Sequence, residues 1–506
     1  MNIKEAKDEI ARSVEIYLDK NEFGEYNIPY MKQRPIFMIG APGIGKTAIM
    51  EQIASELGIA LVSYSMTHHT RQSAIGLPLI EERQYDGEAV KVSEYTMSEI
   101  IASVYRVMEE SGKREGILFL DEINCLSETL APAMLLFLQY KTFGNRRLPE
   151  GWVIVTAGNP PQYNKSVKDF DVATLDRLKC FSIEEDFGIW KSYAYQNGIH
   201  AAIITFLEIN PEWFYSIRTT VDGVQYVTAR GWEDLSLAIG IYEKKKFDVN
   251  RNLVQQYITD TEIAGKFSIY YDLFKKYKSD YKVEDILNGI LSEELLERVG
   301  KAGFDERISL LGLILENLNM QFDQTVHQEM VLERVVKILR IAKKETAEKD
   351  DANIVQLLDK KCAEIQAEKD SAAAANSLSN DQKREYRDAM SLLKEYMTEC
   401  AKAEEPKKQF QRIKKRFDAQ AKKHQNQAEE VKEHLENAFG FLTQAWGNGQ
   451  EMILFMTELT ANADSMHFIE LWGSASYFQY NQDLLIYDVH QKLQREIMES
   501  LSLGTV

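Results

Sequence analysis

The sequence has little cysteine and little proline. Its 506 residues include 4 cysteines and 10 prolines. Cys125, Cys180, Cys362 and Cys400 are scattered along the chain, with no CxxC pair and no histidines at ligand spacing. This pattern argues against both a disulfide framework and a zinc site. We therefore expect the four thiols to be reduced and structural.

Signals for secretion and membrane insertion are lacking as well. No run approaches the roughly 18 uncharged apolar residues that a membrane span needs, and the start Met1–Asp8 lacks the apolar core of a signal peptide. We expect a cytoplasmic protein without membrane contact. Positive charge is in deficit, with 60 Lys and Arg against 78 Asp and Glu and a net charge of −18. Nucleic acid is therefore not expected as the main partner, and another protein is favoured.

What the chain does have is a glycine-rich loop directly after an apolar run. Pro35–Ile39 leads into Gly40-Ala41-Pro42-Gly43-Ile44-Gly45-Lys46-Thr47, and a helix is predicted from Ala48 to Leu57. Glycines let backbone N–H groups turn inward around phosphate, the lysine adds positive charge at the β and γ oxygens, and the threonine hydroxyl is a ligand for Mg²⁺. The helix start at Ala48 adds its N-terminal dipole. This spacing predicts a nucleoside triphosphate site, whereas an ordinary glycine turn would not need the strand before it and the helix behind it.

A second motif follows about 75 residues further on, within the usual size of an α/β nucleotide-binding domain. The run Gly116–Leu120 suits a buried central strand of a parallel sheet and ends in Asp121 and Glu122. Ligands bind at the carboxyl edge of such sheets. Asp121 is predicted to hold Mg²⁺ through water, and Glu122 to orient and deprotonate the attacking water. An apolar run that ends in acids is weak evidence for a nucleotide site by itself. It becomes strong evidence together with the glycine-rich loop at Gly40.

Strand patterns alternate with helical patterns over the first 185 residues, after an N-terminal amphipathic helix. This alternation predicts an α/β fold with a parallel sheet, with strands at Pro35–Ile39, Ile59–Ser65, Gly116–Leu120, Trp152–Ala157 and Cys180–Ile183.

An insertion separates the second and third of these strands. Leu79–Glu82 and Ala89–Ser93 flank the turn-prone Gln84–Gly87, which predicts a β-hairpin, and Met97–Glu110 is predicted to be a helix. After Asp186 the pattern becomes helical, apart from a small hairpin at Tyr215–Val227.

These patterns divide the chain into five predicted parts. The stretch from Ser371 is small and polar and is the best linker candidate, although its alanines could equally continue the preceding helix. The parts are an α/β nucleotide-binding core at 1–185, a helical lid at 186–250, a helical region at 251–370, a linker at 371–382 and a C-terminal helical domain at 383–506.

Three further polar residues lie where an oligomeric ATPase would need them. Asn159 follows the fourth strand and could help Glu122 hold the water, although Asn before Pro is also a turn signal. Arg177 precedes the fifth strand and could reach the γ-phosphate of a neighbouring subunit, or form a surface ion pair. Arg230 opens a helix beyond the sheet and could close on bound nucleotide, or contact no ligand.

The motifs GAPGIGKT, FLDEIN, TAGNP, LDR and TARGWED occur in an order that resembles the AAA+ ATPases, specifically their MoxR-like, dynein-related branch. The resemblance covers about Ile28 to Asp248. It implies a five-stranded α/β sheet, a small helical lid, ATP as the nucleotide, and a homo-oligomeric ring, commonly a hexamer.

The resemblance also implies individual roles. Gly40 to Thr47 resemble the Walker A loop, Asp121 and Glu122 the Walker B pair, Asn159 sensor 1, Arg177 the arginine finger and Arg230 sensor 2. The hairpin at Leu79–Ser93 resembles the helix-2 insert that faces the ring pore, and backbone at Ile28–Tyr30 resembles the segment that packs on adenine.

Several positions depart from the family pattern. Ala229 stands where many relatives have proline, which leaves the position of Arg230 less firmly fixed. Arg146 and Arg147 are rival candidates for the finger. No aromatic-hydrophobic-Gly tripeptide follows the second strand, and this favours remodelling of a bound partner over threading.

Three other signals have plainer interpretations. His68 and His69 are adjacent on an extended segment, point to opposite faces and are expected to contact a loop or partner rather than a metal. The basic stretch Lys407–Lys423 could grip nucleic acid, but an amphipathic helix with solvated lysines is favoured. The aromatic-rich Trp472–Tyr487 is expected to be core of a terminal helical domain.

The leading hypothesis is an ATP-hydrolysing, ring-forming chaperone or remodeller of a protein client. The resemblance implies that clients often carry a von Willebrand factor A domain, which this chain would have to find on a separate polypeptide. The rival is a nucleic-acid-directed motor of a restriction or defence type that grips through Lys407–Lys423. A third hypothesis is a nucleotide-gated scaffold with slow turnover.

Overall fold

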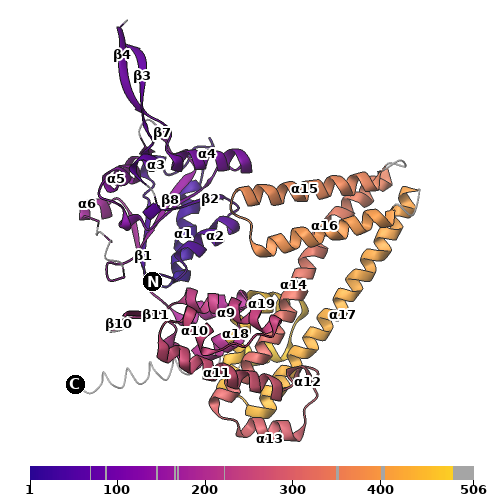
Figure 1. Cartoon of the computed structure of the whole chain (residues 1–506). Helices are drawn as coiled ribbons and strands as arrows, with labels where there is room; N and C mark the ends of the chain where they lie inside the picture. Colours follow the sequence, from indigo (N-terminus) through magenta and orange to yellow (C-terminus); the bar gives the residue numbers. More distant parts are fainter. Residues whose placement is uncertain are drawn as a thin grey trace, which may run out of the picture. The chain divides into compact units, whose positions relative to one another are not determined.

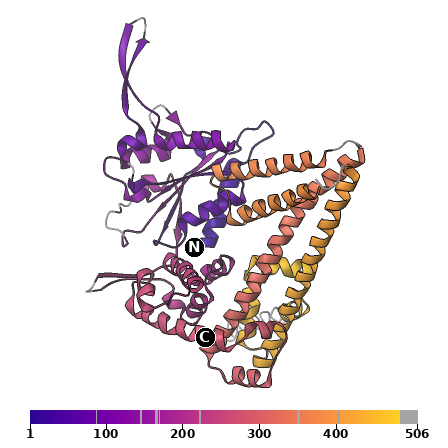
Figure 2. The same ribbon diagram turned by 45° about the vertical axis from the view of Figure 1, so that its right-hand side comes forward.

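The computed structural model describes residues 1–482 except 69, 86–87, 144–145, 164–166, 168–169, 221–222, 349–352 and 401–404. The chain divides into two compact units (Figures 1 and 2). The first unit comprises residues 1–189 and 356–394, and the second comprises residues 190–355 and 395–506. His69, the turn residues 86–87 and 221–222, and Tyr487 lie outside the described residues.

The first unit is built on a five-stranded sheet in the order β2-β5-β8-β1-β9, with every neighbouring pair parallel. The α/β fold class predicted from the sequence is confirmed. All of β8 is buried and β5 is buried up to its last residue, as apolar runs in central parallel strands should be. The strands are β1 Ile36–Gly40, β2 Ala60–Ser65, β5 Gly116–Asp121, β8 Trp152–Gly158 and β9 Lys179–Ile183.

Helices flank the sheet in both views (Figures 1 and 2). The helix after the glycine-rich loop begins at Lys46, two residues before the predicted start. The core between α4 and the sheet contains Val104, Ala60, Val62 and Leu118. Other elements of this unit are α1 Ile3–Leu18, α2 Lys46–Glu56, α3 Arg71–Ile75, α4 Glu99–Ser111, α5 Ala131–Tyr140, β6 Thr142–Phe143, β7 Arg146–Arg147 and α6 Val172–Leu175.

The predicted insertion is an antiparallel hairpin of β3 (Pro78–Tyr85) and β4 (Glu88–Tyr95). It extends away from the sheet (Figure 1). Ile80 is 72% exposed, and Leu79 and Val90 are also exposed. The hairpin therefore presents apolar side chains to its surroundings.

A second extension is formed by α15 (Ile354–Ala374) and α16 (Asn380–Cys400). The two helices run side by side in both views (Figures 1 and 2). The segment 371–382 covers the last turn of α15, the connecting turn and the first turn of α16, so its alanines continue the helix. We call residues 371–379 the tip. The boundary between the two units falls within α16, after Lys394.

The second unit is largely helical. Its two longest helices, α14 (Phe304–Glu348) and α17 (Pro406–Trp446), are antiparallel neighbours (Figure 1), as the pairs Gln321–His434 at 2.8 Å and Glu329–His424 at 4.0 Å show. The other elements are α7 Phe187–Gln196, which begins in the first unit, α8 Ala201–Ile209, β10 Ser216–Thr220, β11 Gly223–Val227, α9 Ala229–Lys245, α10 Arg251–Tyr257, α11 Thr261–Asp280, α12 Val283–Leu287, α13 Glu293–Lys301, α18 Gln450–Ala461 and α19 Ala463–Trp472.

Candidate functional site

The glycine-rich loop connects β1 to α2 in a conformation that requires glycine. Gly45 precedes the helix with φ of 96°, in the left-handed region that side chains rarely adopt. A Cβ on Gly40 would lie 2.9 Å from the backbone oxygen of Ile183 and 2.7 Å from Ile44 Cδ1. Gly45 is needed for its left-handed backbone, and Gly40 is needed because its neighbours leave no room for a side chain.

Lys46 is buried at the start of α2, where it is 8% exposed. Its ammonium donates hydrogen bonds of 2.8 Å to the carbonyl oxygens of Gly40 and Ala41, and one of 2.9 Å to Oδ1 of Asn159. The cation is thus surrounded by oxygen acceptors at the mouth of the loop. This chemistry fits a group that binds phosphate oxygens.

Thr47 and Asp121 meet at the same sheet edge. The Thr47 hydroxyl donates a hydrogen bond of 3.0 Å to Oδ2 of Asp121, which ends β5. A hydroxyl and a carboxylate are the hard oxygen ligands that Mg²⁺ takes beside phosphates. The donor set therefore fits a magnesium ion held with a nucleotide.

Glu122 points the other way. It has a left-handed backbone (φ 57°), and its Oε2 accepts hydrogen bonds of 2.9 Å from each of the hydroxyls of Ser65 and Thr67. Ser65 is the last residue of β2, the neighbour of β5 on the side away from β8 and β1, and Thr67 follows in the turn Met66–His68. The adjacent acids therefore diverge, with Asp121 turned to the loop and Glu122 turned to the edge strand.

Ser65 and Thr67 were not predicted as site residues. The signal that would have found them is the parallel pairing of β2 with β5, which places Ser65 opposite Asp121. Carboxyl ends of neighbouring parallel strands meet at one edge, so polar residues there belong to the same site. The sequence shows the strand, but it does not show that β2 is the neighbour of β5.

Asn159 is held in place by a second asparagine. Asn124 Nδ2 donates a hydrogen bond of 2.8 Å to the backbone oxygen of Asn159. A Cβ on Gly158 would lie 2.5 Å from Oδ1 of Asn124, so this glycine lets the two segments approach. The structure thus gathers Lys46, Thr47, Asp121 and Asn159 at one edge, with Glu122 beside them.

The predicted arginines all lie at exposed positions. Arg177 is exposed after α6 and donates a hydrogen bond of 2.8 Å to the Ala173 carbonyl of that helix. Arg146 and Arg147 are exposed on β7. Arg230 is exposed near the start of α9 in the second unit. Their roles stay predictions.

The segment from Ile28 to Tyr30 is contacted by a buried cation that was not predicted from the sequence, Lys141 at the end of α5. Lys141 is 2% exposed, donates a hydrogen bond of 2.6 Å to the Tyr30 carbonyl and lies 4.0 Å from the centre of the Tyr30 ring. Burial lowers the pKa of Lys141 to about 7. The Ile28 carbonyl accepts a hydrogen bond from Gln33, so this segment is held by side chains of the same unit.

Residues 36–171 match the family described as ATPase family associated with various cellular activities (AAA). The match supports an ATPase of the AAA+ type. The AAA match spans β1 to the start of α6 and includes the loop, Asp121, Glu122 and Asn159. No curated protein matches the chain.

Among the described residues, no group of three or more His, Cys, Asp or Glu side chains could hold a metal ion. No described helix is long and apolar enough to cross a membrane.

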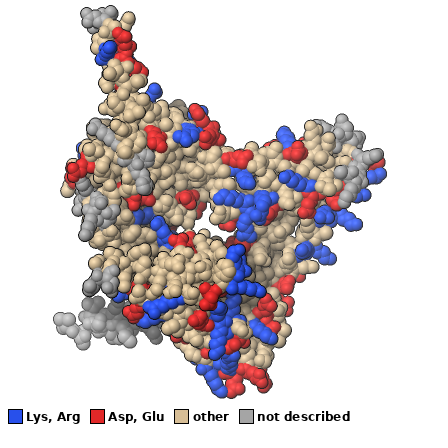
Figure 3. All heavy atoms as spheres, viewed as in Figure 1, with Lys and Arg blue, Asp and Glu red and all other residues tan. Residues whose placement is uncertain are grey.

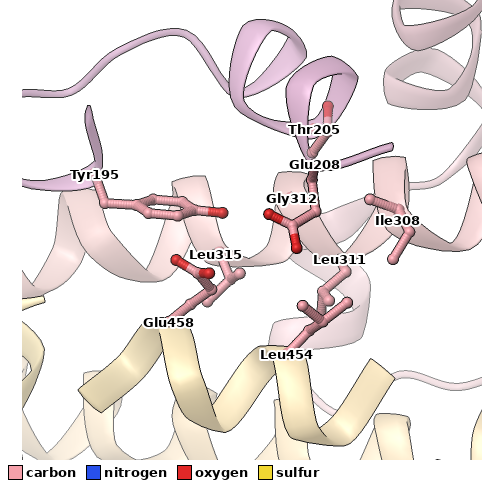
Figure 4. Close-up of a pocket in the computed structure, with 9 residues that line it drawn as sticks. All are labelled: Tyr195, Thr205, Glu208, Ile308, Leu311, Gly312, Leu315, Leu454 and Glu458. Carbon is pink, nitrogen blue, oxygen red and sulfur yellow. The ribbon is translucent and has the colours of Figure 1, made fainter. Parts of the chain in front are cut away.

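The second unit contains a buried charged cluster of a different kind. Tyr195, Glu208 and Glu458 point into one small cavity between helices (Figure 4). Lys191 bridges the two carboxylates, at 2.7 Å from each. Burial raises the pKa of Glu458, which is 4% exposed. Because α7, α8, α14 and α18 all contribute, this cluster ties helices together and is not a candidate active site.

Proposed function

We propose that this chain is an ATP-hydrolysing, ring-forming remodeller of the MoxR-like type that acts on a protein client. The observation that carries the proposal is the convergence of Lys46, Thr47, Asp121 and Asn159 at one sheet edge, within the segment that matches the AAA family.

Each residue has a role that its surroundings support. The loop N–H groups and Lys46 bind the triphosphate, and Thr47 and Asp121 hold Mg²⁺. Bound Mg²⁺ neutralises charge that develops on the phosphate oxygens. Glu122 takes the proton from water once it leaves Ser65 and Thr67, and Asn159 orients that water.

Assembly of the ring supplies further positive charge at the bound nucleotide. Arg177 is exposed on the first unit, where a fixed cation can reach the nucleotide of a neighbouring subunit. Arg230 contributes from the lid of the same chain. The exposed apolar residues Leu79, Ile80 and Val90 of the β3–β4 hairpin support a surface that contacts other chains.

The client class to test first is a protein with a von Willebrand factor A domain, in the cytoplasm. Glu122→Gln is expected to bind ATP, hydrolyse it at least about a hundredfold more slowly and retain its client. Affinity capture with this variant in ATP, with and without nuclease, followed by mass spectrometry, tests the proposal. Lys46→Ala, which should not bind ATP, is the matched control. A turnover rate unchanged by Glu122→Gln would contradict any role of this site in hydrolysis.

One observation favours a second candidate function, a nucleic-acid-directed motor. The antiparallel pairing of α14 and α17 brings two basic segments alongside each other, 334–344 and 407–423, and Asp418 is the single acid within their sequences. Figure 3 shows Lys and Arg on the surface of the second unit, with Asp and Glu among them. The basic residues are Arg334, Lys337, Arg340, Lys343 and Lys344 on α14, and Lys407, Lys408, Arg412, Lys414, Lys415, Arg416, Lys422 and Lys423 on α17.

The apolar side of α17 packs as an amphipathic helix should. Ile413 is fully buried, and Phe410 and Phe417 are half-buried, while Lys414 and Lys415 are exposed. Binding of DNA or RNA that weakens steeply with salt and is lost in Lys414→Glu/Lys415→Glu would support the second function. Partners that survive nuclease would support the first.

A further inference from the structure

The turn between α15 and α16 is attached to the free edge of the sheet. Leu61 of β2 donates its backbone N–H to the Ala375 carbonyl at 2.8 Å, and Asn376 Nδ2 donates to the Leu61 carbonyl at 3.1 Å. Both polar groups that Leu61 presents outward are therefore satisfied by the tip. Asn376 adopts φ of 52°, a left-handed conformation that Asn tolerates. The tip thus covers the edge strand locally, as a short added strand would.

Other contacts anchor the tip to the end of α4. Ser371 Oγ donates a hydrogen bond of 2.6 Å to the Ser111 carbonyl, and Lys113 Nζ donates one of 2.8 Å to Ser377 Oγ. Ala375 is fully buried and belongs to the same apolar cluster as Ala60 and Val62 of β2. The docking is therefore both polar and apolar, and it fixes β2 and α4 together.

The same strand holds the acid of the candidate site. Ser65 ends β2, and its hydroxyl, with that of Thr67, binds Oε2 of Glu122. At about 3.3 Å per residue, the docked Leu61 and Ser65 are roughly 13 Å apart along one extended segment. Within the described sheet, β2 has β5 on one side only, and the tip covers part of its other side.

We propose that Ala375 and Asn376 are positioning residues for Glu122, which act through β2. Docking of the tip keeps β2 in register, so that Ser65 and Thr67 hold Glu122 turned away from the glycine-rich loop. Release of the tip loosens this hold and raises basal ATP hydrolysis. The inference rests on the proposed function of Glu122 and adds a regulatory contact to it.

The helix that carries this contact continues into the second unit. Near the far end of α16, Tyr396 donates a hydrogen bond of 2.5 Å to Gln420 of α17, and Glu395 pairs with Arg416 of α17 at 3.0 Å. α16 is one unbroken helix from Asn380 to Cys400, so the chain passes from the tip directly to residues that contact α17.

The test compares three variants of the full chain. Ala375→Glu places a charge at a fully buried position and should undock the tip, whereas Ala373→Glu adds the same charge two residues earlier, at an exposed position in the last turn of α15. Asn376→Gly tolerates the positive φ and removes only the amide that binds Leu61. Hydrogen exchange of the Leu61 amide, measured without nucleotide, reports docking directly. Exchange should accelerate in Ala375→Glu and Asn376→Gly but not in Ala373→Glu.

The kinetic readout separates positioning from general damage. We expect kcat for ATP to rise about fivefold in the undocked variants, the factor that one typical net hydrogen bond is worth, with KM within about twofold. Ser65→Ala/Thr67→Val should raise kcat similarly, and Ala375→Glu added to it should have no further effect. Undocking without a change in kcat, additive effects, or unchanged Leu61 exchange in both tip variants would each overturn the inference.

Failure of the proposed function would look different. If the wild-type chain did not hydrolyse ATP, or if Glu122→Gln did not reduce turnover, the role of Glu122 would be wrong and the positioning inference would fall with it. The Leu61 exchange would still show whether the tip docks on β2.

Discussion

Lys46 and Asn159 lie 113 residues apart in the sequence and share a hydrogen bond of 2.9 Å. The bond links the first turn of α2 to the end of β8, which is the direct neighbour of β1 in the sheet. The lysine is therefore held toward the residue that, in the proposed mechanism, orients water. In the proposed mechanism Lys46 binds nucleotide and Asn159 orients water. Substitutions at the two positions should therefore affect binding and turnover differently.

Asn159→Ala should affect turnover more than binding. Loss of the amide leaves the loop carbonyls as partners for Lys46, so nucleotide affinity should change by less than about threefold while kcat falls roughly a hundredfold. Lys46→Ala should instead weaken affinity by at least about tenfold. Titration with a fluorescent nucleotide and steady-state kinetics check both. Gln162→Ala, at an exposed position nearby, serves as the control.

Arg177→Ala should leave ATP binding nearly intact and abolish turnover, because the arginine is proposed to act on the neighbouring subunit. Mixing it with Lys46→Ala subunits should restore part of the activity, since hybrid rings contain some intact interfaces. The same pair of measurements on Arg146→Ala and Arg147→Ala decides among the three arginines. Absence of rescue at every mixing ratio would exclude Arg177 as the finger.

Lys191→Met should destabilise the second unit by roughly 3 kcal/mol, because it leaves the carboxylates of Glu208 and Glu458 without their shared cation. The loss should be smaller at mildly acidic pH, where Glu458, whose pKa burial raises, takes up a proton more readily in the folded state. Urea unfolding at two pH values measures both effects. Lys266→Met breaks an exposed pair with Glu262 and should cost less than about 0.5 kcal/mol.

Glu243→Gln should destabilise the chain in a pH-dependent way. Hydrogen bonding to His200, with a further bond from Tyr271, lowers the pKa of Glu243 to about 2. The carboxylate therefore adds stability above its ordinary pKa near 4.5, and this contribution is lost as the pH falls toward 2.

Since the Glu243 side chain is about one third exposed, we expect a difference of about 1 kcal/mol at pH 7. Wild type and variant should begin to converge below about pH 4.5 in urea unfolding and should meet near pH 2. A difference that is undiminished at pH 3 would show that the carboxylate charge is not its source. Glu297→Gln, in an exposed pair with Lys301, is the matched control.

Much of the first unit could be predicted because its signals are local. Each buried parallel strand is an apolar run, and the loop at Gly40 needs glycines wherever the backbone turns tightly. These patterns gave the five strands, the β3–β4 hairpin and the loop, and the structure confirms the α/β sheet. The start of α2 was predicted two residues too late, at Ala48 instead of Lys46, because cap positions depend on backbone geometry more than on residue type.

The sequence by itself determined which residues can perform phosphate chemistry, since the spacing of Gly40 to Thr47 and of Asp121 and Glu122 is encoded in short segments. The tertiary structure alone decided which distant groups meet them. The two hydroxyls that hold Glu122 come from Ser65 at the end of β2 and from Thr67 just after it, and the cover of β2 comes from Ala375 and Asn376, more than 300 residues after Leu61. Such partners depend on strand order and on the return of α15 and α16 to the sheet, and neither leaves a periodic pattern in the chain.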